Sequence, residues 1–332
     1  MPTEPSAPLL SFDDAQKHFP VRGDGLFGGG ARVVRAVDGV SFDIAPGETL
    51  AFVGESGCGK TTLVKLALRI EQPTSGAIRF RGRPLADLDR SELQTYRSTV
   101  QAVFQDPTSS LNPRLDVAAI VGEPVQINTN LSRTERLARV REMLRLVGLP
   151  DDSWRRYSHE FSGGQRQRIA IARALALRPS LIVLDEAVSA LDVSIQAQIL
   201  NLLKELQGAF GLSYLFVSHN LATVRYMSDR VAVMYLGRIV ETGPSESVFE
   251  RRLHPYTRAL LAAALPAHPQ DARPPLSIAG EVPSALNLPS GCRFRTRCPL
   301  AQDICANVEP PLAEFGGGHR AACHFAGEPD RT

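Results

Sequence analysis

The fold of this chain is decided by the stretch Gly54–Thr61, which reads GESGCGKT. It fits the pattern G-x-x-x-x-G-K-[ST], in which a glycine-rich backbone turns its N–H groups around phosphate oxygens. The apolar run Thr49–Val53 before it predicts a buried strand, because a Pro46-Gly47 turn precedes the run. Apolar residues after it recur at helical spacing, at Leu63, Leu66, Ala67 and Ile70. Strand, glycine loop and helix are the context that this pattern needs.

The residues of this loop are assigned roles by their chemistry. Lys60 is expected to reach the β- and γ-phosphates of a nucleotide, and the Thr61 hydroxyl to hold Mg²⁺. The helix N-terminus adds a partial positive charge. The predicted nucleotide contacts of the loop are Gly54, Ser56, Gly57, Cys58, Gly59, Lys60, Thr61 and Thr62.

Composition excludes several classes of protein. The 332 residues carry 37 Lys and Arg against 35 Asp and Glu, so nothing points to nucleic acid as a partner. No apolar run approaches the roughly 18 residues of a membrane span, and the first residues, MPTE, lack a signal segment. We therefore expect a cytosolic protein that can still dock onto a membrane protein.

The remaining pattern predicts an α/β fold. Strand-like segments at 12–19, 33–44, 77–80 and 99–104 suit a sheet core with an antiparallel flank, and the unbroken apolar run 181–184 is typical of a parallel strand. Further strands are expected at 214–217, 231–234 and 239–240, and helices at 91–97, around Ile169–Leu175, along Ile195–Leu206 and near 255–265. A capping box at Ser132–Glu135 opens a helix in an insertion that covers about residues 106–165. A flexible glycine-rich loop is expected at 22–31. Prolines between 266 and 289 mark a linker, so the predicted domains are 1–265 and 266–332.

Polar residues at four further places can act on a bound nucleotide. Asp185 and Glu186 close the 181–184 strand, where one carboxylate can hold Mg²⁺ and the other can polarise a water. Ser162–Gln165, which reads SGGQ, opens a helix with two glycines that leave N–H groups open to an anion. Gln105 and His219 each follow a strand, where they can reach the metal, the water or a terminal phosphate. The alternative for each is an ordinary polar residue or helix cap.

Together these motifs resemble the ATPase subunit of ABC transporters, nearly from end to end. The loop at 54–61 is similar to Walker A, Gln105 to the Q-loop, FSGGQ at 161–165 to the signature motif and LDE at 184–186 to Walker B. SALD at 189–192 is similar to the D-loop and His219 to the switch histidine. The resemblance implies a P-loop NTPase fold with ATP and Mg²⁺ bound. It makes Glu186, His219 and Gln105 catalytic, with Gln105 also a Mg²⁺ ligand beside Thr61 and Asp185. Phe161, Ala187 and Asn220 depart from the usual residues without removing a catalytic group.

The oligopeptide/dipeptide importers are the branch that the chain resembles most. The segments VFQDP at 103–107, SLNPR at 110–114, HPYTRAL at 254–260 and PSGCRFRTRCP at 289–299 look like theirs. In that branch Phe19 is the aromatic residue that stacks on adenine. The resemblance leaves the solute open, since dipeptides, oligopeptides, nickel and other small solutes are carried by relatives with similar ATPases.

The resemblance also implies an assembly. Two ATPase chains meet head to tail, with each ATP between one Walker A loop and the other chain's Ser162, Gly163, Gly164 and Gln165. The second chain is a paralogue or an identical copy. Two transmembrane permease subunits and an extracytoplasmic peptide-binding protein complete the importer, and the chain lies peripherally at the cytoplasmic face of the membrane. The rival interpretations are a soluble, non-transport ABC ATPase and a metal-dependent regulatory nucleotide-binding protein.

Four of the five cysteines crowd the end of the sequence, with spacing C-x5-C-x6-C-x17-C at Cys292, Cys298, Cys305 and Cys323. This spacing matches neither a zinc ribbon nor a ferredoxin, so reduced thiols, zinc and an iron–sulfur cluster all stay open on the residues alone. The resemblance implies a [4Fe–4S] cluster. The arginines nearby are then expected to offset the negative charge of the cluster: Arg293, Arg295, Arg297 and Arg320.

Overall fold

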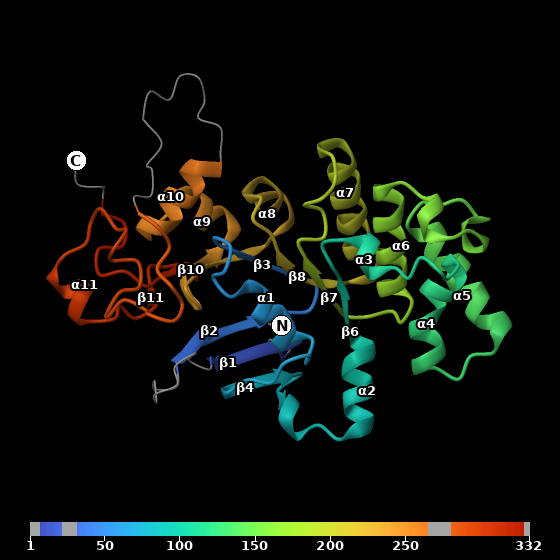
Figure 1. Cartoon of the computed structure of the whole chain (residues 1–332), viewed down its shortest axis with the longest axis horizontal. Coiled ribbons are helices and arrows are strands. Elements are labelled where there is room, and N and C mark those ends of the chain that lie inside the picture. Colours follow the sequence, from blue (N-terminus) through green and yellow to red (C-terminus); the bar gives the residue numbers. More distant parts are fainter. Residues whose placement is uncertain (1–6, 22–31, 265–279, 329–332) are drawn as a thin grey trace, which may run out of the picture. The chain divides into compact units, whose positions relative to one another are not determined.

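The computed structural model describes residues 7–21, 32–264 and 280–328, and these form two compact units. One, the phosphate-loop unit, comprises residues 11–43, 50–79 and 219–332, and the other, the helical unit, comprises 1–10, 44–49 and 80–218. The predicted glycine-rich loop at 22–31 and most of the predicted linker lie outside the described residues. Figure 1 shows the chain, with elements of both units labelled where there is room.

The phosphate-loop unit is built on a sheet whose strands run in the order β11-β12-β10-β9-β3. β3 (Thr49–Val53) is parallel to β9 (Arg230–Tyr235), with Val53 opposite Val233. β9 is antiparallel to β10 (Arg238–Pro244). All five residues of β3 are buried, as the unbroken apolar run predicts for a central parallel strand.

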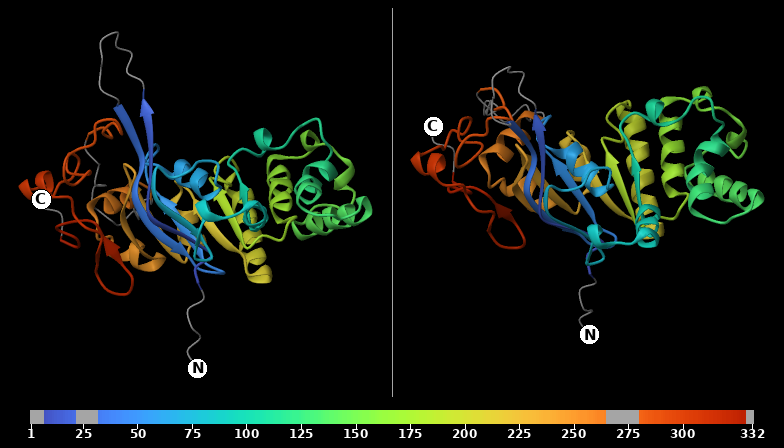
Figure 2. Two further views of the ribbon diagram at one scale, coloured as in Figure 1. Left: turned by 90° about the horizontal axis from the view of Figure 1, so that it is seen from below. Right: turned by 60° about the horizontal axis from the view of Figure 1, so that its bottom comes forward.

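A second sheet in this unit has the order β2-β1-β4. Its strands are β1 (Leu10–Val21), β2 (Arg32–Ile44) and β4 (Ser75–Phe80), and Figure 2 shows β1 and β2 running side by side. Three aromatic rings join it to the central sheet. Phe12 stacks on Phe42 with ring centroids 4.4 Å apart, and Phe42 meets Phe52 of β3 edge-on at 4.9 Å. The predicted antiparallel flank is confirmed.

Helices of the phosphate-loop unit are short. They are α1 (Lys60–Ala67), α8 (Leu221–Met227), α9 (Ser245–Arg251), α10 (Pro255–Ala264) and α11 (Asp303–Asn307). The predicted continuation of α1 to Ile70 is wrong. Arg69 adopts φ 54° and the Ile70 side chain is 62% exposed, so the apolar stripe ends one turn early.

The C-terminal residues 280–328 are packed into the phosphate-loop unit. Their short strands β11 (Ala313–Glu314) and β12 (Arg320–Ala321) extend the central sheet, with Ala321 opposite Glu241 of β10. Behind this edge, the fully buried carboxylate of Glu241 accepts hydrogen bonds from the backbone N–H groups of Leu253 and His254 and contacts His319 Nε2 at 2.7 Å. This segment is therefore part of the sheet and its core.

The helical unit carries three parallel strands in the order β8-β7-β6. β6 (Val100–Val103) and β8 (Ser213–Val217) flank β7 (Leu181–Asp185), with Val103 opposite Leu184 and Val217 opposite Asp185. Its helices are α2 (Arg90–Thr99), α3 (Pro107–Ser110), α4 (Val117–Asn128), α5 (Arg133–Leu146), α6 (Gly163–Leu175) and α7 (Val193–Phe210). Minor elements are β5 (Arg83–Pro84) and 3-10 turns at 85–87, 153–155 and 158–160.

The helical insertion is present as predicted between β6 and β7 (green in Figure 1). The capping box at its centre is confirmed: the Glu135 N–H donates to Ser132 Oγ, and the Ser132 N–H donates to Glu135 Oε2. α4 was not predicted, since Pro124 lies inside it. Proline normally breaks a helical pattern in sequence, but here α4 packs against α5 and α6, and that packing sustains it.

Candidate functional site

The phosphate loop encloses the Lys60 amine. This side chain is only 7% exposed, and its Nζ donates to the backbone oxygens of Gly54 at 2.6 Å and Glu55 at 3.0 Å. The ammonium group is thereby fixed at the centre of the loop, directly at the start of α1. A cation held beside a helix N-terminus is suited to bind the terminal phosphates of a nucleotide.

Two glycines are required at this loop by close backbone approach. A Cβ on Gly54 would lie 2.3 Å from the carbonyl oxygen of Met234, and one on Gly59 would lie 2.2 Å from that of Ala36. Gly59 also has φ 114°, in the left-handed region. The predicted loop glycines therefore hold the backbone against β9 and β2, which keeps the loop in one shape.

The other predicted contacts in this unit differ in exposure. Thr61 is exposed and Thr62 half-buried in the first turn of α1, while the thiol of Cys58 is buried, which raises its pKa. Phe19 is half-buried on β1, with Lys17 Nζ 5.0 Å from the centre of its ring. Its predicted stacking on adenine stays a prediction.

His219 is exposed and directly follows Ser218 at the end of β8. Its neighbour Asn220, which departs from the usual family residue, caps α8. Its Oδ1 accepts hydrogen bonds from the N–H groups of Ala222 and Thr223. The departure therefore keeps the capping role that an aspartate would have.

In the helical unit, Asp185 is the last residue of β7, and Gln105 comes two residues after the end of the adjacent parallel strand β6. Glu186 comes next, with φ 50°, a conformation that is costly for a residue with a Cβ. Its N–H donates to Val217 O at 2.9 Å, which ties this strained residue to β8. The parallel arrangement thus gathers these predicted residues at one edge of the sheet.

The SGGQ segment opens α6 with a capping box. The Gln165 N–H donates to Ser162 Oγ at 3.4 Å, and the Ser162 N–H donates to Gln165 Oε1 at 3.0 Å. Position 164 requires glycine because of helix packing, which the sequence did not reveal: a Cβ there would lie 2.5 Å from Ile195 Cγ2 of α7. Both the cap and the tight helix contact fix the direction in which this exposed helix start points.

The four C-terminal cysteines lie near one another. The Cys292 N–H donates to Cys305 O at 2.8 Å, and Cys298 and Cys323 are partly buried beside them. Burial, and to a smaller extent the neighbouring thiols, raise the pKa of Cys298 to about 12 and that of Cys323 to about 11. These mutual effects place the thiols in one region of the phosphate-loop unit.

A metal centre at these cysteines fits in donor type but not in spacing. Sulfur donors suit zinc and iron–sulfur clusters. Among residues 7–21, 32–264 and 280–328, however, no three His, Cys, Asp or Glu side chains are gathered closely enough to hold a metal ion. The predicted [4Fe–4S] cluster is therefore not supported by the geometry and stays a proposal.

Two of the four arginines that were expected to offset the charge of a cluster are paired with carboxylates instead. Arg293, only 8% exposed, bonds the Asp38 carboxylate and the carbonyl oxygen of Leu236. Arg297 pairs with Glu55. These two charges are thus matched by carboxylates, not by thiolates.

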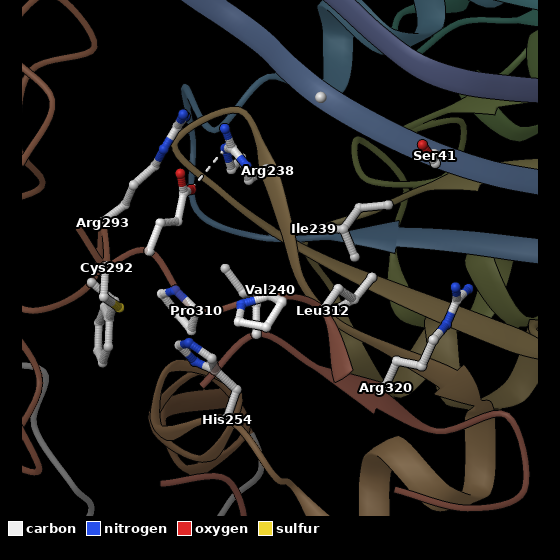
Figure 3. A pocket seen from close by; sticks show the side chains of 15 residues that line it. Ser41, Arg238, Ile239, Val240, His254, Cys292, Arg293, Pro310, Leu312 and Arg320 are labelled. Atoms are coloured by element: carbon white, nitrogen blue, oxygen red, sulfur yellow. Dashed lines mark ion pairs between the residues drawn. The ribbon is translucent and has the colours of Figure 1, made fainter. Parts of the chain in front are cut away.

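A cavity of about 320 Å³ lies between β10 and the C-terminal segment, with Cys292 and Arg320 in its wall (Figure 3). The charged groups that face each other there are already paired, since Arg238 Nε lies 3.0 Å from a Glu309 oxygen and Arg293 bonds Asp38. Hydrogen bonds from Arg293 and His18 outweigh the effect of burial and lower the pKa of Asp38. We assign no ligand to this cavity.

Comparison with known proteins decides the family. The family model described as "ABC transporter" matches residues 37–189, and the one described as "Oligopeptide/dipeptide transporter, C-terminal region" matches residues 240–305. A relative in Sinorhizobium fredii, the probable peptide ABC transporter ATP-binding protein y4tS, is 52% identical over 95% of this chain and 89% of its own. The chain belongs to the ATP-binding subunits of oligopeptide/dipeptide ABC importers. This ABC ATPase therefore has the predicted P-loop NTPase fold.

Further relatives and solved structures support this family assignment. The di/tripeptide transport ATP-binding protein DppF of Pseudomonas aeruginosa is 49% identical over 96% of this ABC ATPase and 98% of its own length. Among solved structures, the dimeric post-hydrolysis state of the ATP-binding cassette MJ0796, bound to ADP and Pi, has a TM-score of 0.62. It is 28% identical and covers 71% of this chain and 98% of its own. No helix within the described part of the ABC ATPase is both long and apolar enough to span a bilayer.

Proposed function

We propose that this ATPase powers the import of peptides through a membrane permease, by closing and reopening a head-to-tail pair of such subunits. The observation that carries the proposal is the buried Lys60 amine, centred in the phosphate loop of a chain that also matches the peptide-transporter C-terminal region. That second match favours transport over the soluble, non-transport and metal-dependent regulatory alternatives. Relatives named as peptide transport proteins point to the same class of solute.

The site residues divide the work of binding and hydrolysis. Lys60 and the N–H groups of the loop bind the phosphates, and Phe19 stacks on adenine. Thr61, Asp185 and Gln105 would hold Mg²⁺, which when bound would neutralise charge on the phosphates. Glu186 orients the attacking water, and His219 bonds the terminal phosphate.

The signature segment completes the site from the opposite chain. Ser162, Gly163, Gly164 and Gln165 start a capped helix, in which Ser162 Oγ accepts from the Gln165 N–H and the N–H groups of the two glycines precede the first intrahelical bond. Such a helix start binds an anion, and we assign it the γ-phosphate of the ATP held by the partner subunit. Loss of that phosphate on hydrolysis removes the bridging contact, so the pair reopens.

Complementation between two inactive chains tests the shared site. Lys60→Ala disables the loop and Ser162→Ala disables the signature segment, so each variant alone is expected to be inactive. Mixed with permease, the two restore part of the turnover if identical chains pair, because one intact composite site forms. Restoration only with a co-expressed paralogue shows a heterodimer. If neither the mixture nor added permease raises turnover above that of the isolated wild type, the shared site is wrong.

The permease subunits and an extracytoplasmic peptide-binding protein are the proposed partners. With them, the chain takes a peripheral position at the cytoplasmic face of the membrane. The helical insertion and Gln105 are the proposed route by which nucleotide-driven movement reaches the permease. Retention of the wild-type chain on detergent-solubilised permease tests this assignment, since a soluble, non-transport ATPase does not bind it.

We further propose that Cys292, Cys298, Cys305 and Cys323 hold a [4Fe–4S] cluster. The support is the donor type, four thiols in one C-terminal segment, of which Cys292 and Cys305 are joined by a backbone hydrogen bond of 2.8 Å. Protein purified without oxygen is expected to be brown, with about four iron and four sulfide per chain by colorimetric analysis. Replacement of any of the four by Ser should bleach the colour, whereas the buried Cys58→Ser control should not. If the anaerobically purified protein contains stoichiometric zinc and no iron, the [4Fe–4S] assignment is wrong, but the four cysteines still form a metal site.

A further inference from the structure

The C-terminal segment contacts the phosphate loop directly, through a paired fork of hydrogen bonds. Arg297 Nη1 lies 2.7 Å from Glu55 Oε2, and Nη2 lies 3.0 Å from Oε1. The Arg297 side chain is 5% exposed and that of Glu55 26%. Two parallel N–H···O bonds fix both the position and the plane of the carboxylate.

Glu55 is held at two further points, both on its backbone. Its N–H donates to the Tyr256 hydroxyl at 2.8 Å, and its carbonyl oxygen accepts from Lys60 Nζ at 3.0 Å. Any displacement of Glu55 therefore moves one of the two carbonyl oxygens that orient the Lys60 amine. The Arg297 fork acts on that amine through a single residue.

The segment that carries Arg297 has a rigid base. Phe294 is 1% exposed and packs against Tyr235 and Tyr256, with ring centroids 5.3 and 5.4 Å apart. The Arg297 N–H donates to Phe294 O at 3.0 Å, which joins the arginine to this aromatic cluster by a tight turn. Arg297 therefore reaches the loop from a fixed position.

The ion pair between Arg297 and Glu55 lacks the features that make a buried ion pair strongly stabilising. The Nε of Arg297 is buried without a hydrogen-bond acceptor among the described residues. A buried ion pair pays a desolvation penalty that its attraction often only balances, and an unmet donor adds to that cost. The clearer effect of the pair is to hold the phosphate loop in one conformation. A loop that is already ordered loses less conformational entropy when it binds a ligand.

We propose that Arg297 is a positioning residue for nucleotide binding, and that the C-terminal segment of this ABC ATPase thereby belongs to its ATP-binding machinery. The fork on Glu55 keeps the first turn of the phosphate loop, and with it the Lys60 amine, in the shape that receives the phosphates. This inference rests on the ATP-binding function. The competing explanation is that the pair only anchors the C-terminal segment.

ADP binding to the purified full-length chain tests the proposal by calorimetry. ADP is chosen because it has no γ-phosphate to bridge two subunits, so its Kd reports on the loop side alone. Arg297→Met keeps the length of the side chain and removes the fork, and the Kd should rise about tenfold. Arg297→Lys keeps the charge but not the fork, and should recover only part of that loss. Arg295→Met is the matched control, since the Arg295 side chain bonds Ser290 and not the phosphate loop, and should leave the Kd unchanged.

A second variant and a melting curve separate positioning from anchoring. Glu55→Gln breaks the same fork from its more exposed side, and the double variant with Arg297→Met should bind ADP no more weakly than the worse single variant. In ATPase assays the KM for ATP should rise while kcat stays within about twofold. If Arg297→Met and Glu55→Gln lower the melting temperature but leave the Kd for ADP within about twofold of wild type, the proposal is overturned. The ATPase function would survive that result, because it depends on Lys60.

Discussion

Replacement of Glu186 by glutamine is expected to lower ATP turnover by a factor of about 10² or more while ATP still binds. The physical reason is the loss of a carboxylate that orients and polarises the attacking water. The side chain keeps its length, and the strained backbone at φ 50° is unchanged, so the substitution tests charge and not shape. Because the γ-phosphate stays intact, the ATP-bound pair of subunits should accumulate as a stable dimer.

Single-turnover ATPase assays and size-exclusion chromatography in MgATP measure the two effects. Glu205→Gln is the control, because Glu205 is an exposed residue of α7 in the same unit. Wild-type turnover in Glu186→Gln would remove the assignment of Glu186 as the residue that directs water. Loss of ATP binding together with turnover would point instead to a damaged fold at the end of β7.

Replacement of Lys60 by alanine should weaken nucleotide binding itself, by a factor on the order of 10² to 10³, since two or more charge-assisted contacts of about 2 kcal/mol are lost. The amine lies inside the loop, and no other Lys or Arg belongs to the stretch 54–61. Equilibrium titration with ADP and with ATP should give parallel losses, because both carry the β-phosphate.

Lys65→Ala is the matched control for this variant. Lys65 lies in the same helix α1, but its side chain is exposed, so its loss should change the Kd only slightly. An unchanged Kd in Lys60→Ala would mean that the loop amine does not reach the phosphates. The assignment of the phosphate loop as the nucleotide-binding site would then be wrong.

Elements with strong local patterns could be predicted from the sequence. β3 begins and ends at the predicted residues, because five buried residues between a Pro46-Gly47 turn and a glycine loop allow no other interpretation. The capping box at Ser132 is also a local signal and is confirmed. The family motifs lie on loops whose short-range spacing defines them, so they too were visible in sequence.

Contacts between distant residues could not be predicted in this way. Glu55 and Arg297 are 242 positions apart, and nothing local marks either as the partner of the other. The charge of Arg297 was instead explained by the nearest feature in sequence, the cysteines. The error over Arg297 arose because residues close in sequence were taken for neighbours in space. The tight packing of Gly164 against Ile195 of α7 likewise appears only when the two helices come together, because the residues are 31 positions apart in sequence.

The left-handed backbone of Glu186 has a consequence for protein engineering. Glycine or asparagine accepts φ 50° at lower cost than glutamate, by about 1 kcal/mol for glycine. A selection that rewards heat resistance alone would thus favour loss of the carboxylate that we propose orients the attacking water. The residue at position 186 that gives the higher thermostability is therefore not the one that we expect to give turnover. A mutant library designed to raise thermostability should leave residue 186 unchanged.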